Sequence, residues 1–353
     1  MVLPSATIAV HGGAGVVHAA LQRHGEEAYR DALRAALAAG HAVLSANGSA
    51  LDAVEAAVRE LEDSPLFNAG RGSVYCDDGT HRMEASLQDG ASRAAGAVIG
   101  LQSTRHPISA ARAVMERTRH VALVDCDGWA AAQGLEQRPP EWFDTADRLE
   151  QLLAARRSDR LSLDHDDASA SARQCGTVGA VALDRLGRLA AATSTGGMTN
   201  KMAGRVGDTP VIGAGTHACG LCALSATGKG EQFLRHAVTA SIGARVACGV
   251  PLAVACDEVV HGILQPGDGG CIGIDRFGVL SMPFNTEGMF RGWLKEQEGV
   301  PHVAIWRDTK DKLLPAPRIN HIGNPSLRSV AWFCMGALGA ALVLSLRMRA
   351  VNR

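Results

Sequence analysis

The stretch Cys175-Gly176-Thr177-Val178-Gly179-Ala180-Val181-Ala182-Leu183-Asp184 decides how this chain is interpreted. After Thr177 the residues are apolar and partly β-branched, a pattern that predicts a buried strand. The residues before Gly176 are small and polar and predict no ordered element. A hydroxyl residue that begins a core strand behind a loose loop suggests a chain that is cut before the threonine. The alternative is an ordinary strand that happens to begin with Gly-Thr.

Composition restricts the kind of protein. The chain has 353 residues, of which 46% are hydrophobic, enough for one large domain or two ordinary ones. Only 4% are aromatic while 40 residues are glycine, which favours layered α/β packing with close backbone approaches. The formal net charge of -1 gives no electrostatic argument for binding nucleic acid or an anionic membrane surface.

The nine cysteines lack the spacing of a disulfide framework. No secretory signal is predicted, because residues 1–10 are short and lack a basic region. We therefore expect reduced thiols and a cytoplasmic protein. Cys219 and Cys222 form a lone CxxC motif without a second pair at zinc spacing, which favours two buried structural thiols over a metal or redox site.

Periodicity and turn residues predict the elements between these features. Strands are expected at 6–10, 83–87, 94–101, 121–124, 211–214 and 218–225, and helices at 26–39, 49–62, 107–117, 129–133 and from about 226 to 248. Two further pairs of strands, at 177–193 and 270–282, are hairpins. Paired antiparallel strands share an edge, so the first hairpin places Thr195 near Thr177.

Two segments differ from this globular pattern. Residues 144–174 are rich in Asp, Arg, Ser and Ala and predict a mobile, exposed linker. The acidic and histidine side chains at 164–167 are interpreted as solvated linker charge, because nothing there preorganises metal ligands. Residues 330–346 are mostly apolar and precede two arginines, at the short limit for a membrane span. A tail anchor in a membrane, a buried appendage and a chain end outside the working enzyme remain open for this run.

Six motifs in order resemble those of the plant-type L-asparaginase/isoaspartyl peptidase family, which are N-terminal-nucleophile hydrolases of the threonine type. They are His11–Gly15, Phe67–Gly72, Gly176–Ala182, Thr193–Lys201, Gly204–Asp208 and Thr227–Glu231. The resemblance runs from about residue 6 to residue 293. It implies an α/β fold of four layers, an αββα sandwich, and self-cleavage between Gly176 and Thr177.

The implied cleavage divides one domain into two subunits. Residues 1–176 form the α subunit, residues 177–305 form the core of the β subunit, and residues 306–353 are a C-terminal extension. The resemblance further implies that two such αβ units assemble into an (αβ)2 heterotetramer.

The resemblance also implies roles for single residues. Thr177 is the nucleophile, Thr195 orients it, and Asn68 orders its neighbourhood. The Thr227 hydroxyl and the Gly228 N–H form the oxyanion hole. After cleavage the α-amine of the nucleophile has a pKa of about 7.7–8.0, so it can act as general base without a histidine.

The substrate's amino-acid head group is matched by opposite charges. Arg205 would bind its α-carboxylate, Asp208 its α-amine, and Gly230 would contribute a backbone contact. Lys229, beside the oxyanion turn, suggests the hypothesis that substrates with an extra carboxylate are favoured. A surface ion pair is the plain alternative for Arg205 and Asp208.

The loop Leu61–Arg71 matches the sodium-binding loop of the family, in which backbone carbonyls hold a structural cation. The implied carbonyl donors are Leu61, Glu62, Ser64, Phe67, Ala69 and Arg71. The family often has an aliphatic residue where Arg71 stands, so we expect the Arg71 side chain to point to solvent. No cofactor is expected for catalysis itself.

The sequence therefore predicts a self-processing threonine amidohydrolase that cleaves L-asparagine and β-aspartyl peptides through an acyl-enzyme on Thr177. Its partners would be small-molecule or dipeptide substrates and not nucleic acid. One alternative is a glycosylasparaginase-like amidase. Another is an inactive family member that is tethered to a membrane through residues 330–346.

Overall fold

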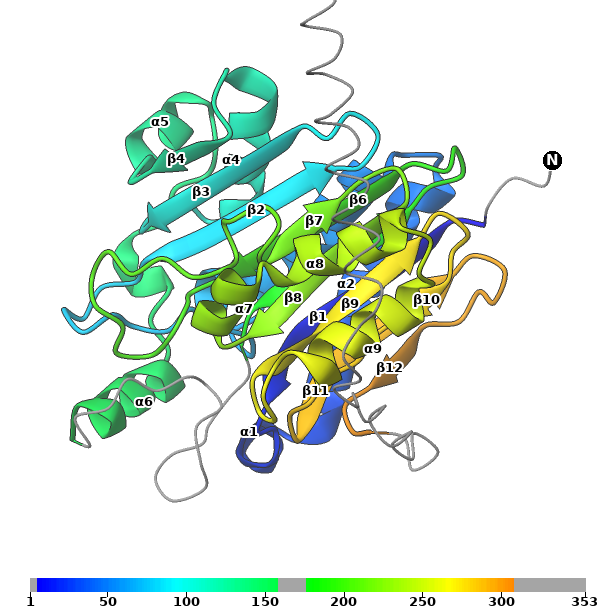
Figure 1. The fold of residues 1–353 in the computed structure, drawn as a ribbon. Helices are drawn as coiled ribbons and strands as arrows, with labels where there is room; N and C mark the ends of the chain where they lie inside the picture. Colours follow the sequence, from blue (N-terminus) through cyan, green and yellow to red (C-terminus); the bar gives the residue numbers. More distant parts are fainter. Residues whose placement is uncertain (1–4, 158–175, 308–353) are drawn as a thin grey trace, which may run out of the picture. The chain divides into compact units, whose positions relative to one another are not determined.

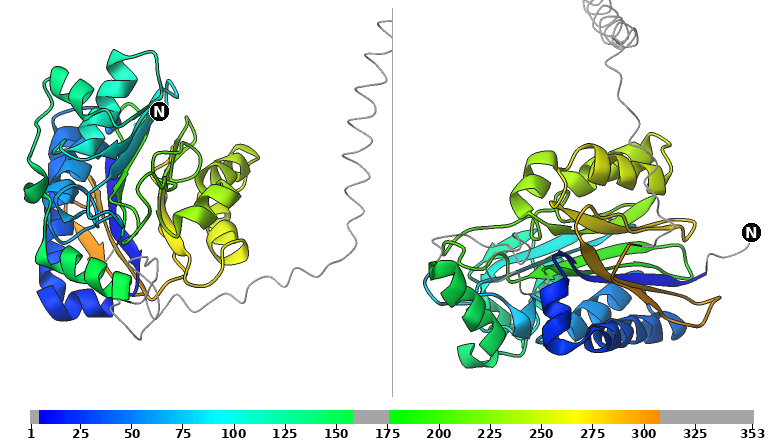
Figure 2. Two further views of the ribbon diagram at one scale, coloured as in Figure 1. Left: turned by 90° about the vertical axis from the view of Figure 1, so that its left-hand side faces the viewer. Right: turned by 90° about the horizontal axis from the view of Figure 1, so that it is seen from below.

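Two sheets lie face to face between two groups of helices in a computed structural model that describes residues 5–157 and 176–307 (Figure 1). The left view of Figure 2 shows these layers side on, with helices outside both sheets. This order confirms the predicted αββα architecture. Each sheet covers one face with the other sheet and one face with helices, which explains the apolar runs in the strand sequences.

The predicted hairpin after Thr177 lies at the centre of the large sheet. In the described residues this sheet has eight strands, in the order β12 (His302–Ala304), β11 (Gly288–Lys295), β1 (Thr7–Gly15), β5 (Val178–Leu183), β6 (Leu189–Thr195), β2 (Met83–Asp89), β3 (Ala95–Leu101) and β4 (Ala122–Val124). Strands β5 and β6 are buried along their whole length. Strand β1, which precedes the predicted cleavage site in sequence, thus lies between β11 and β5, which follow it.

The small sheet covers the centre of the large one. In the described residues its four strands run in the order β10 (Leu280–Ser281), β9 (Gly269–Asp275), β8 (Cys222–Gly228) and β7 (Thr216–Ala218). Strand β8 packs on β5 and β6, and β9 packs on β1. The end of β8 at Gly228 thereby comes close to the start of β5.

Helices cover the outer face of each sheet. On the large sheet these are α2 (Glu26–Ser45), α3 (Ala50–Asp63) and α4 (Pro107–Arg117), and on the small sheet α8 (Val238–Ala247) and α9 (Leu252–Gly262). Further helices are α1 (His18–His24), α5 (Asp127–Ala132), α6 (Ala146–Arg157), α7 (Gly230–His236) and the 3-10 turns η1 (Gly70–Gly72) and η2 (Pro140–Trp142).

Helix α3 forms where the sequence predicts it, for identifiable reasons. The Ser49 hydroxyl accepts the Asp52 N–H at 3.1 Å, and the Asp52 carboxylate accepts the Ser49 N–H at 3.3 Å, which completes a capping box. Its buried face includes Ala53, Val54, Ala57, Val58 and Leu61. The helix ends one residue before Ser64-Pro65, which places its carboxyl end at the start of the loop 61–71.

Helix α6 shows that the prediction of an exposed linker is wrong for residues 146–157. Arg148 and Leu152 are buried, and Arg148 Nε donates to the Gly72 carbonyl at 2.6 Å. The polar composition is misleading because the acidic Asp147 pairs with Arg23 on helix α1. Residues 158–174 of the predicted linker lie outside the described residues.

Three other predicted elements differ from the structure. Residues 211–214 form turns around Gly213 instead of a strand. The predicted strand 218–225 is the β7–β8 hairpin, whose turn separates Cys219 from Cys222. The predicted long helix is divided into α7 and α8 by Ala237, which adopts a left-handed conformation with φ +43°.

Some predictions fall outside the described residues. They concern Cys175 and the C-terminal extension beyond 307, including the apolar run 330–346. Among the residues that are described, none of the helices is both long and apolar enough to cross a membrane.

Candidate active site

Thr177 directly precedes β5, and Thr195 ends β6, the strand paired with β5. The Thr177 hydroxyl donates a hydrogen bond to Thr195 Oγ1 over 3.2 Å. Thr195 Oγ1 also accepts the backbone N–H of Gly197 at 2.9 Å, which fixes the orientation of its side chain. Both threonines are buried. The hairpin therefore brings together the two hydroxyl groups that the sequence predicts to meet.

The glycines of β1 hold the Gly176–Thr177 junction from the neighbouring strand. The strand bulges between His11 and Gly13. Gly13 has φ +110°, and a Cβ atom there would lie 2.5 Å from the backbone nitrogen of Gly176. A Cβ atom at Gly12 would lie 2.3 Å from the Phe67 ring. Close packing thus requires glycine at both positions, at Gly13 against the junction and at Gly12 against Phe67.

The His11 ring is fully buried beside Thr177. Its Nε2 atom lies 2.9 Å from Ser225 Oγ, and the ring also faces the backbone of Thr177. Burial lowers the pKa of His11 to about 3, although the contact with the Thr177 backbone acts in the opposite direction. His11 is therefore an uncharged hydrogen-bonding group at neutral pH.

Asn68 connects its own loop to the turn after β6. Its Nδ2 atom donates to the Gly197 carbonyl at 2.7 Å, and its Oδ1 atom accepts the Val74 N–H at 3.0 Å. Its backbone carbonyl accepts the Gly196 N–H at 3.0 Å. Asn68 thereby fixes the two glycines that follow Thr195.

Thr227 and Gly228 end β8 beside the same junction. Thr227 is fully buried, and its Oγ1 atom accepts at 3.3 Å the N–H of Ala14, the residue after the glycine that contacts Gly176. Gly228 has φ +151°, and a Cβ atom there would lie 2.0 Å from the Asp268 carbonyl oxygen. The end of β8 thus places the Thr227 hydroxyl group and the adjacent Gly228 peptide group near the predicted cleavage site.

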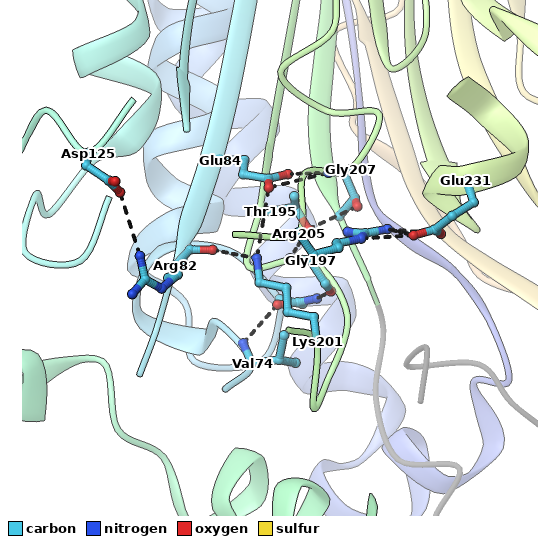
Figure 3. A network of polar contacts seen from close by, with 12 residues as sticks. Val74, Arg82, Glu84, Asp125, Thr195, Gly197, Lys201, Arg205, Gly207 and Glu231 are labelled. Carbon is cyan, nitrogen blue, oxygen red and sulfur yellow. Dashed lines mark hydrogen bonds and ion pairs between the residues drawn. The ribbon is translucent and has the colours of Figure 1, made fainter. Parts of the chain in front are cut away.

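Arg205 and Asp208 flank Gly230. A Cβ atom at Gly230 would lie 2.8 Å from both Arg205 Nη2 and Asp208 Oδ1, so the three predicted substrate-binding residues form one cluster. Arg205 Nε and Nη2 donate to the two carboxylate oxygens of Glu231 at 3.0 and 3.1 Å (Figure 3). This bidentate pair holds the guanidinium plane in one orientation.

Asp208 is a buried carboxyl group that is incompletely paired. Its side chain is largely hidden, and its Oδ2 atom has no hydrogen-bond partner among the described residues. Burial raises the pKa of Asp208 to about 7, against the opposing effect of the Arg205 guanidinium. A ligand with an ammonium group would supply both the missing donor and the missing charge.

The sequence matches the model of the Asparaginase family over residues 4–305. The chain belongs to the Asparaginase family. It is 48% identical over 311 residues to the isoaspartyl peptidase of Salmonella typhimurium, which covers 86% of this chain and 99% of that protein. The isoaspartyl peptidase of Escherichia coli is 47% identical over 314 residues, or 87% and 98% of the two chains. The human isoaspartyl peptidase/L-asparaginase is 38% identical over 309 residues, or 84% and 95%.

Sequence reasoning missed two buried charged residues, Glu84 and Lys201, that lie behind Arg205 in this member of the Asparaginase family. Glu84 on β2 accepts the Gly207 N–H at 3.1 Å, and Lys201 Nζ lies 4.0 Å from Glu84 Oε1 (Figure 3). Lys201 Nζ also donates to the Arg82 carbonyl at 2.7 Å, and burial lowers its pKa. Glu84 and Lys201 fix the loop that carries Arg205. An acidic residue between Met83 and Ala85 at the start of a predicted strand is the signal that could have revealed Glu84.

Two carbonyl groups of the loop Leu61–Arg71 are packed tightly against glycines. Gly70 has φ +50°, and a Cβ atom there would lie 2.3 Å from the Glu62 carbonyl oxygen. A Cβ atom at Gly72 would lie 2.0 Å from the Phe67 carbonyl oxygen. The glycines therefore let the Glu62 and Phe67 carbonyl groups lie against the backbone of Gly70 and Gly72, where a side chain would collide.

The side chain of Glu62 connects this loop to the catalytic hairpin. Its Oε1 atom accepts the Ser194 hydroxyl at 2.6 Å and the Ile108 N–H at 3.0 Å. Burial raises the pKa of Glu62 to about 8. Because Ser194 immediately precedes Thr195, the end of α3 and the end of β6 are held together by this carboxyl group.

Two side chains mark departures from the family pattern. Arg71 is exposed and its guanidinium lies over the Trp142 ring at 5.5 Å, away from the loop interior as expected. Lys229 Nζ lies 3.4 Å from Asp268 Oδ1. Its charge is thus engaged in an ion pair, which weakens the hypothesis that it recruits an extra substrate carboxylate.

Proposed function

We propose that this chain is an amidohydrolase that cuts itself before Thr177 and then hydrolyses L-asparagine and β-aspartyl peptides. The observation that carries the proposal is the Thr177 hydroxyl, 3.2 Å from Thr195 Oγ1 on the paired strand. The close contact of Gly13 with the Gly176 backbone supports the cleavage site. The names of the relatives, isoaspartyl peptidase and isoaspartyl peptidase/L-asparaginase, support the substrate class.

In the uncut chain, Thr177 Oγ1 would attack the Gly176 carbonyl carbon. The C–N bond between the two residues breaks, an ester forms between the Gly176 carbonyl and Thr177 Oγ1, and the nitrogen becomes a free α-amine. Water then hydrolyses the ester, which leaves a carboxylate on Gly176 and restores the hydroxyl group. Glycine at position 176, and at position 13 on the neighbouring strand, removes side chains that would block this approach.

In the mature protein the freed α-amine would act as general base. Its ordinary pKa of about 7.7–8.0 leaves part of it unprotonated near neutrality. It takes the Thr177 hydroxyl proton as Oγ1 attacks the side-chain amide carbon of the substrate, and it gives a proton to the departing ammonia or peptide amine. Water attacks the resulting acyl ester and the amine takes its proton. The acyl C–Oγ1 bond then breaks, the amine returns a proton to Thr177 Oγ1, and aspartate leaves.

Each neighbour has a defined task in this reaction. The Thr227 hydroxyl and Gly228 N–H would donate to the oxygen that becomes negative, and removal of one such donor typically raises the barrier by roughly 3 kcal/mol. Arg205 and Asp208 would bind the carboxylate and ammonium of the head group. Because Glu231 occupies Nε and Nη2 of Arg205, the remaining Nη1 group is the one free of that pair.

We also propose that the loop Leu61–Arg71 holds a sodium ion through its backbone carbonyls. The Glu62 and Phe67 carbonyls, which lie against Gly70 and Gly72, are oxygen donors of the kind that a small hard cation prefers. In the described residues no group of three or more His, Cys, Asp or Glu side chains could hold a metal ion, so the donors would be carbonyls. The ion would act structurally, by fixing the loop that carries Asn68.

Two further proposals concern the whole protein. Assembly into an (αβ)2 heterotetramer follows the family resemblance. A cytoplasmic location is supported by the cysteines of the described residues, which are all free thiols.

A substrate panel tests the proposed function. Wild-type protein is assayed for ammonia from L-asparagine and for aspartate from a β-aspartyl dipeptide, with Thr177→Ala as the matched control. We expect turnover of both substrates by the wild type and none above background by the variant. Preferred hydrolysis of a glycosylated asparagine would favour the glycosylasparaginase alternative, and absence of turnover with every substrate would favour an inactive protein.

A further inference from the structure

A row of polar residues lies directly behind the catalytic threonines, between the two sheets. On the large sheet the residues in register across four strands are His11, Gly179, Thr193 and Ser86. On the small sheet the residues paired in register are Thr216 and Ser225. Because strand side chains alternate, Thr193 faces the same side as Thr195, one step deeper in the sheet interface.

These side chains form an unbroken series of hydrogen bonds, here called the hydroxyl chain. Its contacts are His11 Nε2 to Ser225 Oγ at 2.9 Å, Ser225 Oγ to Thr193 Oγ1 at 2.8 Å, Thr193 Oγ1 to Thr216 Oγ1 at 2.6 Å, Thr216 Oγ1 to Ser86 Oγ at 2.8 Å, and Ser86 Oγ to the Thr209 carbonyl oxygen at 2.6 Å. Every member is fully buried.

The two ends of the hydroxyl chain touch the two halves of the candidate active site. At one end the His11 ring faces the backbone of Thr177. At the other end Ser86 holds the carbonyl of Thr209, the residue directly after Asp208. The hydroxyl chain therefore connects the predicted nucleophile, Thr177, to Asp208, the residue predicted to bind the substrate ammonium.

The donors are defined at one end of the hydroxyl chain. Ser86 Oγ is placed to donate to the Thr209 carbonyl or to Thr216 Oγ1, and Thr216 Oγ1 donates to Thr193 Oγ1. Either hydroxyl group can be the donor between Thr193 and Ser225, and the tautomer of the His11 ring decides the donor between Ser225 Oγ and His11 Nε2. The ring nitrogens of His11 therefore report on the hydrogen bonds of the chain.

The local sequence is built to accommodate these contacts. A Cβ atom at Gly179 would lie 2.0 Å from Ser225 Oγ and 2.5 Å from His11 Nε2, so any side chain would break the first link. Elsewhere the sheet interface is filled by apolar residues such as Val181, Ala191 and Ile272. Apolar residues alone would hold the two sheets together. Buried polar side chains are tolerated only when each has a hydrogen-bond partner.

We propose that the hydroxyl chain is a positioning device that sets the placement of Thr177 relative to Asp208. The inference rests on the proposed function. The residues of the hydroxyl chain are not proposed to touch substrate, and they act through His11 at one end and Thr209 at the other. The Ser86 end should therefore govern substrate binding, and the Ser225 end should govern self-cleavage and turnover, because self-cleavage does not use the residues that bind the head group.

A substitution in the middle of the hydroxyl chain tests whether its hydrogen bonds contribute to activity. Thr216→Val keeps the side-chain shape but removes the hydroxyl group, Thr216→Ser keeps the hydroxyl group, and Thr239→Val replaces a buried threonine whose Oγ1 atom has no partner among the described residues. We expect Thr216→Val to lower kcat/KM for L-asparagine by at least about tenfold, with Thr216→Ser and Thr239→Val close to wild type. Equal activity of Thr216→Val and Thr239→Val would overturn the proposal.

The two ends are then compared. Ser86→Ala is expected to raise KM several-fold while self-cleavage proceeds at the wild-type rate. Ser225→Ala is expected to slow self-cleavage and kcat with a smaller change in KM. The same kinetic defect from both variants would show a general loss of folding and would contradict a positioning role.

The His11 ring gives a readout that does not depend on activity. In nitrogen NMR of ring-labelled protein, with the His11 signal assigned by its loss in His11→Gln, Thr216→Val should shift the His11 ring nitrogens and Thr239→Val should not. Unshifted ring nitrogens in Thr216→Val would overturn the connection between Thr216 and His11. If wild-type protein neither cuts itself nor hydrolyses substrate, the proposed function fails, whereas the His11 ring signal still tests the hydroxyl chain separately.

Discussion

The carboxyl group of Asp208 is buried, and one of its oxygens lacks a partner among the described residues. Burial raises its pKa to about 7, so below that pH it is mostly protonated and cannot pair with a substrate ammonium. We expect KM for L-asparagine to rise roughly tenfold between about pH 8 and about pH 6. Steady-state kinetics on cleaved protein measures this, and a KM that stays constant over the range would contradict it.

The same shift makes Asp208 a destabilising residue above neutral pH. The folded state binds this proton more tightly than the unfolded state, whose ordinary pKa is 3.8, so stability present at low pH is lost as the pH rises to about 7. Asp208→Asn stays uncharged and should melt several degrees above wild type at about pH 8, but not at about pH 4. Calorimetry with the exposed Asp257→Asn as control measures this, and a lower melting temperature at the higher pH would count against it.

Lys229 is predicted to have little influence on substrate choice. Its Nζ atom lies 3.4 Å from the buried Asp268 carboxylate, so its charge is largely compensated. We expect Lys229→Thr to change the ratio of kcat/KM for a β-aspartyl dipeptide and L-asparagine by less than about threefold. A tenfold loss confined to the dipeptide would instead restore the hypothesis that Lys229 recruits a second carboxylate.

At the scale of elements, the bulge in β1 is expected to control self-cleavage. Gly13→Ala introduces a Cβ atom 2.5 Å from the Gly176 nitrogen at φ +110°, whereas Gly134→Ala places one at φ +80° in open space. We expect Gly13→Ala to remain full length on a denaturing gel and Gly134→Ala to cleave like wild type. Normal cleavage of Gly13→Ala would show that β1 does not hold the junction.

Elements with strong local signals were predictable from sequence. The capping box of α3, the Pro at the start of α4 and the turn of the β5–β6 hairpin each act over a few residues. Helix α6 was missed because its stability comes from distant partners such as Gly72. The break between α7 and α8 was missed because Ala237 adopts a left-handed conformation that its residue type does not indicate.

Site residues within the quoted motifs were also predictable from sequence. The buried residues that hold them in place were not. The structure brings Thr195 to Thr177 and Arg205 to Asp208, as expected. The hydroxyl chain depends on the register of strands that are far apart in sequence. Periodicity reports which face a residue occupies but not which residue of a distant strand lies opposite.

At the scale of the whole molecule, sodium should contribute to stability through the loop Leu61–Arg71. A ligand that binds only the folded state raises its stability by mass action. Exchange of sodium for choline is therefore expected to lower the melting temperature by several degrees and to reduce activity. Sodium chloride should restore both, and equal choline chloride should not. An unchanged melting temperature would argue against the site.

The central claim is that Thr177 becomes an N-terminal nucleophile. Intact-mass spectrometry of wild-type protein and Thr177→Ala tests it most directly. We predict that wild-type protein yields two fragments, one ending at Gly176 and one beginning with Thr177, while the variant stays as one full-length chain. A wild-type protein that remains uncut, or a variant that is cut at the same bond, would contradict this account.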